Sequence, residues 1–391
     1  MNSDDRIPVT LITGFLGSGK TTLLNRIVRD PSMEKTLFII NEFGTIGLDH
    51  DLVSLAEDNQ VVEMASGCLC CTIRGDLVKT LHDAPWRFAR GGERWFDRVV
   101  IETTGLADPL PILHTLMTEE KLAASYRLDG VLTVVDAATG LSTIDDQEES
   151  LRQVAVADRL LLTKTDLAAS EDVVAIEGRL RAINPGAPLA RVVQGAVDPS
   201  RLFGIGVYDP ATKGEQVTGW LADEAVAAAS GHHSHHGHSH SHSHHDHDHH
   251  HDINRHGDHI RSVSLAFDEP LSAHAVERWL DALMMFCSHD MLRTKGILNL
   301  KEFDKPVVIH GVQHIFHPPV TLDAWPSEDR RTRVVFITRN IDEAKLRETL
   351  GLLTEGISRF EIYGPDGSGL TGSGPSRLAR STERDDLSLI R

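Results

Sequence analysis

Short apolar runs alternate with helix-compatible segments over about the first 200 residues of the chain. The runs lie at residues 7–13, 35–41, 97–102, 129–136 and 158–163. Each is too continuously apolar for a strand with one face in water, so each is predicted to be a strand buried on both faces. Between them lie segments long enough for crossover helices, such as 20–30 and 171–183. The alternation predicts an α/β domain over residues 1–211, with a mostly parallel sheet and helices on both faces.

The pattern changes twice further along the chain. Residues 212–258 end in a stretch of histidine, serine and glycine with too little apolar surface to fold, which predicts a disordered linker. A second folded unit is predicted from residue 259, with strands at 259–267, near 295–300, at 305–310 and at 332–338, and with helices at 271–286 and from 341. These elements indicate a smaller α+β domain over 259–366, followed by a flexible tail at 367–391.

Composition and charge narrow the class of protein. Of the 391 residues, 40% are hydrophobic and 25% are charged, which is ordinary for a soluble globular protein and does not indicate a membrane protein. The formal net charge of −18 argues against unassisted binding to nucleic acid or to an anionic membrane, because both depend on Lys and Arg neutralising phosphate. A cationic partner suits this charge better. The first residues are acidic and lead into no signal-cleavage site, so we expect a cytoplasmic protein.

The strongest chemical signal is the sequence GFLGSGKT at residues 14–21. It fits the phosphate-binding pattern GxxxxGK[ST], with an apolar strand before it and a helix-compatible segment after it. A glycine-rich loop of this kind turns consecutive backbone N–H groups toward phosphate oxygens. Lys20 is expected to reach the β- and γ-phosphates, and Thr21 to bind Mg²⁺. The other residues predicted to hold the nucleotide here are Gly14, Gly17, Ser18, Gly19 and Thr22.

A second motif identifies the base. The tetrapeptide TKTD at residues 163–166 ends a predicted strand and resembles the NKxD motif that reads guanine in GTPases. The Asp166 carboxylate is expected to accept from both guanine donors, N1–H and the exocyclic amine, while Lys164 packs along the base. Adenine offers no such pair of donors, so GTP is the expected nucleotide. Thr163 departs from the motif, in which asparagine is usual, and a helix cap is the alternative explanation.

Mg²⁺ needs an acidic partner, and two acidic residues end apolar strands. Glu102 is preferred because Gly105 follows it at the spacing of a loop that senses a γ-phosphate. Asp136 is the alternative ligand, or it caps the next helix. The glycine-bearing segment 41–49 follows the second strand and is expected to move as a switch loop, with Asp49 contacting Mg²⁺ through water.

Three of the four cysteines lie within four positions, as Cys68, Cys70 and Cys71. A disulfide framework is not expected in a reducing compartment, whereas a turn can bring these thiolates onto one ion. Three thiolates and a fourth ligand suit tetrahedral Zn²⁺, and sulfur also suits Cu(I); Glu42 is the candidate fourth ligand. The alternatives are a redox pair and small buried cysteines. Cys287 lies alone in an apolar helix and is predicted to be core.

Histidines form two further groups. Thirteen of the 23 lie between His232 and His251, interrupted by Ser, Gly and Asp, unlike a purification tag. Imidazoles on a flexible chain bind Zn²⁺, Ni²⁺ or Co²⁺ in many geometries, which predicts a fast, poorly selective collecting site; a solvated polar linker is the alternative. His310, His314 and His317 are either a second small metal site or structural strand residues.

These motifs together resemble the CobW family of metal-trafficking P-loop GTPases. The resemblance is carried by TLITGFLGSGKTTLLN, IINEFGTIGLD, GCLCCT, IETTGLADP and TKTD, and the region from 259 to about 364 is similar to the family's C-terminal domain. In that family the cysteines bind Zn²⁺ or a similar ion, and the nucleotide state controls its transfer to a client metalloprotein. The resemblance implies these roles for Cys68, Cys70 and Cys71. The family also includes activators of cobalt-cofactor synthesis and of nitrile hydratase, and the histidine-rich insert is similar to that of its zinc-associated members.

The resulting hypothesis is a GTP-hydrolysing metallochaperone whose GTP state holds the ion and whose hydrolysis, with docking to a client metalloprotein, releases it; the reverse polarity is the alternative. The alternatives are a cobalt-delivery factor and a passive metal-buffering protein; a P-loop kinase is disfavoured because no lid or acceptor site is evident. No residue that positions the attacking water is identified, so slow intrinsic hydrolysis is expected. The sequence specifies neither the client nor whether the chain forms a homo-oligomer.

Overall fold

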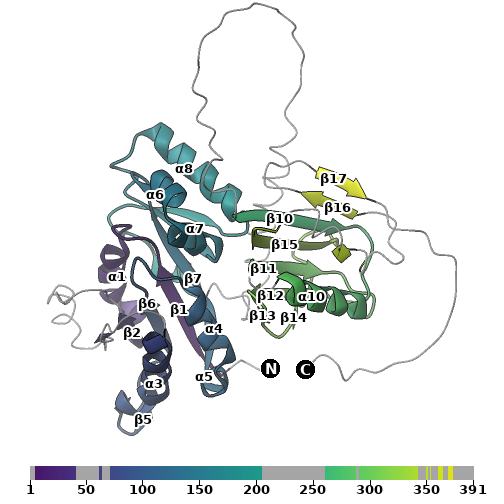
Figure 1. Cartoon of the computed structure of the whole chain (residues 1–391). Coiled ribbons are helices and arrows are strands. Elements are labelled where there is room, and N and C mark those ends of the chain that lie inside the picture. The colour runs from purple at the N-terminus through teal and green to yellow at the C-terminus, as the bar shows by residue number, and fades with distance from the viewer. Residues whose placement is uncertain are drawn as a thin grey trace, which may run out of the picture.

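The computed structural model describes residues 5–40, 61–63, 71–204, 260–287, 290–341, 349–350, 353, 360–363 and 369–372. These residues form two domains, each built on its own sheet (Figure 1). No helix among them is long and apolar enough to span a membrane.

The first domain is built on a seven-stranded sheet in the order β3-β2-β6-β1-β7-β8-β9, and every pair of neighbouring strands is parallel. Its strands are β1 (Ile7–Thr13), β2 (Thr36–Ile40), β3 (Val61–Glu63), β6 (Arg98–Glu102), β7 (Tyr126–Asp136), β8 (Arg159–Thr163) and β9 (Leu189–Val192). Two short strands, β4 (Ala89–Arg90) and β5 (Glu93–Arg94), form a separate hairpin.

Helices cover both faces of this sheet because alternate strand residues point to opposite faces. On β1, Val9 and Leu11 belong to one apolar cluster and Ile12 to another. Helix α1 (Lys20–Val28) packs on the Ile12 side. The opposite face carries α3 (Cys71–Arg87), α4 (Leu110–Thr118), α5 (Glu120–Ser125), α6 (Gly140–Asp146), α7 (Glu148–Ala155) and α8 (Ser170–Ile183). Short 3₁₀ helices lie at Pro31–Met33 and Pro199–Arg201.

The second domain is an antiparallel eight-stranded sheet in the order β13-β12-β11-β15-β10-β16-β17, with β14 also paired to β12. Its strands are β10 (Ile260–Phe267), β11 (Met291–Leu298), β12 (Val307–Val312), β13 (Ile315–Phe316), β14 (Val320–Thr321), β15 (Thr332–Arg339), β16 (Phe360–Tyr363) and β17 (Gly369–Gly372). Helix α10 (Ala273–Cys287) packs on this sheet, where the Trp279 ring meets Phe336 edge-on at 5.5 Å between centroids.

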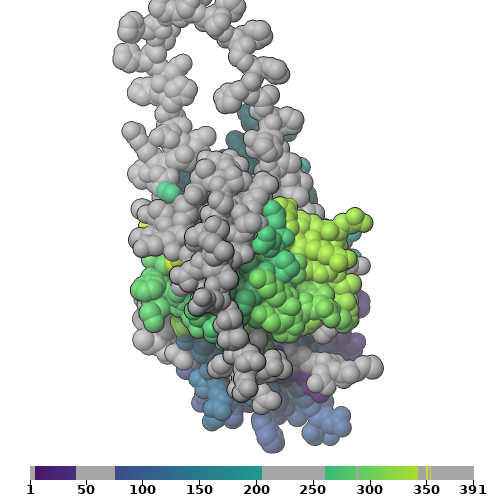
Figure 2. All heavy atoms as spheres, turned by 90° about the vertical axis from the view of Figure 1, so that its right-hand side faces the viewer, coloured from purple at the N-terminus to yellow at the C-terminus, as the bar shows by residue number. Residues whose placement is uncertain are grey.

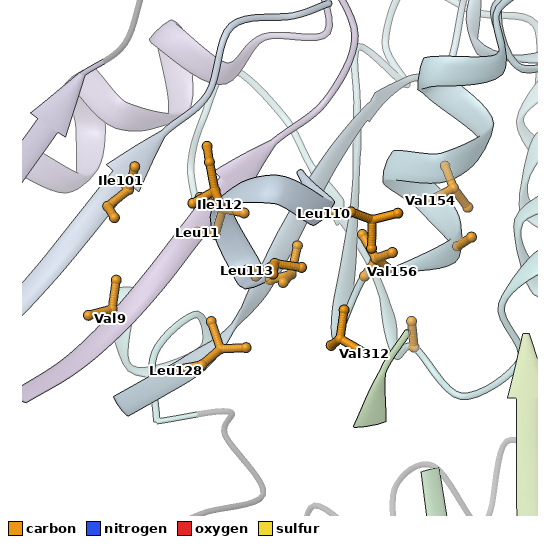
Figure 3. Packing of buried hydrophobic residues seen from close by; sticks show 14 of the residues in the cluster. Val9, Leu11, Ile101, Leu110, Ile112, Leu113, Leu128, Val154, Val156 and Val312 are labelled. Carbon is orange, nitrogen blue, oxygen red and sulfur yellow. The ribbon is translucent and has the colours of Figure 1, made fainter. Parts of the chain in front are cut away.

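The two domains share a packed boundary. Val312 and Ile337 of the second sheet belong to the same apolar cluster as Leu113 of α4 and Val156, which follows α7 (Figure 3). The second domain therefore packs on the face of the first domain that α4 and α7 cover, and Figure 2 shows it in front of the first domain. This contact places α4 and α7 between the two sheets.

The predicted fold class, a mostly parallel sheet with helices on both faces plus a smaller C-terminal α+β domain, is confirmed. Element bounds differ in places: β7 begins at Tyr126, three residues before the predicted strand, and β11 covers Met291–Leu298 instead of 295–300. Strand β17 lies within the segment predicted to be a tail. The predicted linker at 212–258 and most of the helix predicted from residue 341 lie outside the described residues.

Candidate functional site

The glycine-rich loop lies at the carboxyl end of β1 and leads directly into α1, as a phosphate-binding loop must. Gly14, Gly17 and Gly19 have φ angles of 143°, 74° and 97°, in the region that favours glycine. A Cβ on Gly14 would lie 2.2 Å from the backbone oxygen of Val134. The backbone of the loop is therefore pressed onto β7 in a shape that other residues do not adopt.

Lys20 lies inside this loop. It is 8% exposed, and its Nζ donates to the backbone oxygens of Gly14 at 2.8 Å and Phe15 at 3.0 Å. Ser18 is 2% exposed, and its Oγ has no hydrogen-bond partner in the part of the chain that the structure describes. Thr21 and Thr22 lie in the first turn of α1. A buried ammonium group, hydroxyl groups and a helix N-terminus are suited to bind the phosphates of a nucleoside triphosphate with its Mg²⁺.

The loop after β6 lies beside the P-loop. Ile12 and Glu102 are register partners, so Glu102 ends its strand next to the end of β1, where it is 6% exposed. Thr103 fixes this position, because its N–H donates to Ile12 O at 3.0 Å and its Oγ1 donates to Thr13 Oγ1 at 2.8 Å. A Cβ on Gly105 would lie 2.6 Å from the backbone nitrogen of Leu16. The predicted γ-phosphate loop is thus in backbone contact with the P-loop.

The predicted guanine motif follows β8 on the other side of the P-loop. Thr163 Oγ1 donates to Ser18 O at 2.6 Å and lies 3.1 Å from Val135 O. The residue that departs from the NKxD pattern therefore joins this motif to the phosphate loop. The sequence did not predict this hydrogen bond to the phosphate loop, because the NKxD pattern has asparagine, not threonine, at this position. Asp166 is exposed, as a residue that reads a base from solvent must be.

Asp136, the alternative magnesium ligand, is already bound within the protein. Its Oδ2 lies 2.7 Å from Nζ of Lys164, and its Oδ1 accepts from the N–H of Ala138 at 2.7 Å. Lys164 itself has a left-handed φ of 55°. The geometry therefore pairs Asp136 with Lys164 of the predicted guanine motif, and Glu102 remains the predicted magnesium ligand.

The predicted metal loop falls mostly outside the described residues. Cys68, Cys70, Glu42 and Asp49 all lie there, and Cys71 is described only as the first residue of α3. Their attachment points are nevertheless defined. β2 and β3 run parallel to β1, so the segments that follow them leave from the same edge of the sheet as the P-loop. β3 is three strands from β1, a separation of about 14 Å at normal strand spacing.

The histidines of the second domain do not form a metal cluster within the described ranges. His310 and His317 lie together, with ring centroids 6.1 Å apart, beside the buried domain boundary. His314 instead faces His114 of α4 at 5.4 Å. Cys287, predicted to be core, is half-buried and packs against the apolar cluster around Trp279. The structural reading of these histidines is therefore favoured over a second metal site.

Family models match both domains of the chain. Residues 8–191 match the family model of the CobW/HypB/UreG nucleotide-binding domain, and residues 260–353 match that of the cobalamin synthesis protein cobW C-terminal domain. The chain is 32% identical to the zinc chaperone YjiA of Escherichia coli, over 87% of this chain and 96% of YjiA. It is 28% identical to the zinc chaperone CobW of a Sinorhizobium species, over 89% and 97% of the two chains.

Solved structures resemble both domains together. The Zn(II)-bound YjiA GTPase from E. coli superposes with a TM-score of 0.62 at 27% identity, covering 90% of this chain and 98% of YjiA. A Zn(II)-bound triple mutant of the same GTPase gives a TM-score of 0.61 at 29% identity with the same coverage. Zinc-regulated GTPase metalloprotein activator 1 of Dictyostelium discoideum is 34% identical over 56% of this chain and 52% of its own length.

Proposed function

Because this chain belongs to the CobW family of P-loop GTPases, we propose that it is a metallochaperone that binds Zn²⁺ or a similar ion at Cys68, Cys70 and Cys71 and releases it under nucleotide control. GTPase activity follows from the family and from the fold. The observation that carries the proposal is the common edge of the sheet. β1 and β6, which lead into the P-loop and the Glu102 loop, end there, and so do β2 and β3, which precede the cysteine motif in the chain.

The described residues have separate roles in GTP binding and hydrolysis. The backbone of residues 14–19 and the start of α1 surround the phosphates, and Lys20 turns from the Gly14 and Phe15 carbonyls to phosphate oxygens. Asp166 reads guanine while Asp136 holds Lys164 along the base. Mg²⁺, when bound, neutralises phosphate charge; Thr21 and Glu102 would hold it, with Asp49 acting through water.

The cysteine motif supplies a soft site for the cargo. Three thiolates with Glu42 as a fourth ligand make a tetrahedral set suited to Zn²⁺, and Co²⁺ or Ni²⁺ are weaker matches for sulfur. The histidines between His232 and His251 collect ions and pass them to this set. Zinc in the names of the relatives supports zinc as the cargo over cobalt.

Energetics explain why such a carrier hydrolyses GTP. A thiolate site of structural type binds zinc with about 10–16 kcal/mol, which is too tight for release on a useful timescale. A change that costs the site about 4 kcal/mol raises its dissociation constant roughly a thousandfold. β2, which precedes the predicted switch segment 41–49, lies between β3 and β6, so a rearrangement on loss of the γ-phosphate would begin next to the strand that leads to the cysteines. Docking to a client metalloprotein completes the transfer.

Two single substitutions test whether GTP hydrolysis and zinc binding depend on different residues. Lys20→Ala should abolish GTP hydrolysis, because the charge that meets the transferring phosphoryl group is lost. Cys70→Ser should remove tight zinc binding and any effect of Zn²⁺ on hydrolysis while GDP binding stays within about twofold of wild type. The measurements are GTP turnover with and without Zn²⁺ and zinc affinity in competition with a chelator. A Cys70→Ser protein that still binds zinc as tightly as wild type would refute the assignment of the site.

A further inference from the structure

Helix α7 is fixed to the C-terminal domain at both of its ends. At its first residue, Glu148 Oε1 accepts a hydrogen bond from Arg339 Nη1 of β15 at 3.2 Å. In the turn that joins α7 to β8, three residues after the helix ends, Asp158 Oδ1 lies 2.5 Å from Arg293 Nη2 and 3.2 Å from Lys295 Nζ, both on β11. A displacement of the second sheet therefore acts on α7 at two points.

The ion pairs that Asp158 forms with Arg293 and Lys295 are buried. Asp158, Arg293 and Lys295 are 8%, 2% and 8% exposed. Burial by itself raises the pKa of the Asp158 carboxyl, but the charges of Arg293 and Lys295 outweigh burial and hold this pKa well below its usual range. Separating a buried pair of this kind leaves uncompensated charge on both sides. The end of α7 is therefore expected to follow the C-terminal domain.

The last turn of α7 holds the loop that follows Glu102. Gln153 is 1% exposed, and its Nε2 donates to the backbone oxygens of Gly105 at 3.1 Å and Ala107 at 3.0 Å. The neighbouring Arg152 donates through Nη1 to Asp108 Oδ2 at 2.9 Å, and through Nη2 to Glu148. Two consecutive side chains of one helix thus bind three positions of the loop.

The chemistry of Gln153 suits this task. An amide NH₂ group has two donors and no charge, so it satisfies two buried carbonyls without burying an ion. A carboxylate would place lone pairs against both oxygens, and an alkyl group would leave both unsatisfied. Because Gly105 is in backbone contact with Leu16 of the P-loop, the position of this loop fixes the space for a γ-phosphate.

We propose that Gln153 is a positioning residue for GTP hydrolysis and that the C-terminal domain acts on it through α7. The domain contacts at Glu148 and Asp158 set the helix, and the helix sets the Gly105 loop against the P-loop. The GDP state does not need this loop, because GDP lacks the phosphate that the loop senses. The proposal rests on the GTPase activity of the chain and is independent of the ion that it carries.

The first test uses Gln153→Leu and Gln153→Glu in the full chain. Both should lower kcat for GTP and the affinity for a non-hydrolysable GTP analogue by about tenfold or more, with GDP affinity within about twofold of wild type. The ratio of the two affinities separates positioning from general damage, because a poorly folded protein loses both. An unchanged ratio and an unchanged kcat would refute the role of Gln153.

The second test changes the C-terminal domain alone. Arg339→Met removes the contact with Glu148, together with an ion pair to Asp290 inside the C-terminal domain, and should lower kcat and the same affinity ratio by about two- to fivefold. Arg331→Met is the matched control, because Arg331 pairs with Asp329 and Asp268 inside that domain. The control should hydrolyse GTP like wild type. If Arg339→Met behaves like the control, the C-terminal domain does not act through this contact. This variant also keeps the proposal testable should the Gln153 variants fail to fold.

Discussion

At the scale of single residues, two glycines of the first domain differ in how much space surrounds the position of a Cβ atom. Gly105 has no room for a Cβ, since one would lie 2.6 Å from the Leu16 backbone nitrogen. Gly178 lies in α8, and a Cβ there would meet no atom within 4 Å. The same substitution is therefore expected to have opposite effects at the two positions.

Gly105→Ala should lower the free energy of unfolding by about 1–3 kcal/mol and slow GTP turnover, because backbone atoms of two loops must separate. Gly178→Ala should raise the free energy of unfolding by about 0.5–1 kcal/mol, since alanine is the better helix former. Urea unfolding and GTP turnover of both variants check this. Normal turnover in Gly105→Ala would show that the contact between the loops does not matter for hydrolysis.

Residue-scale motifs were the most predictable part of the site. The P-loop, Glu102 and the TKTD motif each sit at the end of a strand where the sequence pattern placed them. Gln153 was not predictable, because a glutamine in a helix has no motif and its carbonyl partners lie 48 and 46 positions earlier in the chain. Glu102 was preferred to Asp136 from the sequence, because Gly105 follows it at the expected spacing, and the ion pair of Asp136 with Lys164 is consistent with that preference.

At the scale of elements, the apolar runs that predicted strands were reliable where both faces of a strand pack on apolar neighbours. They failed where a buried position is polar. β7 begins before its predicted start because Asp129 interrupts the apolar pattern; it is 2% exposed and accepts from Thr10 Oγ1 at 3.0 Å and from the N–H of Gly204 at 2.9 Å. Hydrophobicity alone reads such a residue as the end of a strand.

β11 shows the same effect across the domain boundary. Arg293 and Lys295 occupy buried strand positions because their charges meet Asp158, 135 residues before Arg293 in the chain. No local pattern reveals such a partner, so the prediction began the strand at 295, four residues after the β11 start at Met291.

At the scale of the whole molecule, the domain boundary should be sensitive to acid. Burial lowers the pKa of His317 to about 3, with Arg293 adding to the effect, and lowers the pKa of His310 well below its usual value. The unfolded chain takes up these protons below about pH 6.5, whereas the folded chain does not. The stability from the neutral histidines is therefore present above about pH 6.5 and is lost as the pH falls. The depressed pKa of Asp158 adds a loss below about pH 4.

His317→Gln should flatten this dependence. For each histidine that stays neutral only in the folded state, the free energy of unfolding falls by up to about 1.4 kcal/mol per pH unit below pH 6.5, and the variant should lose one such contribution. Urea unfolding at pH 7, 6 and 5 measures the slope. His82→Gln is the control, because the His82 side chain is exposed to water at 53%. Equal slopes in wild type and His317→Gln would contradict the argument.

We propose that occupancy of the GTP pocket controls how tightly the cysteines hold their ion. The most direct measurement is the zinc affinity of the full chain, in competition with a chelator, with a non-hydrolysable GTP analogue and then with GDP. We predict that the tightest site binds zinc at least about tenfold more strongly in the analogue state, and that Cys70→Ser abolishes this difference. Equal zinc affinity with the two nucleotides would show that the bound nucleotide does not control the cysteine site.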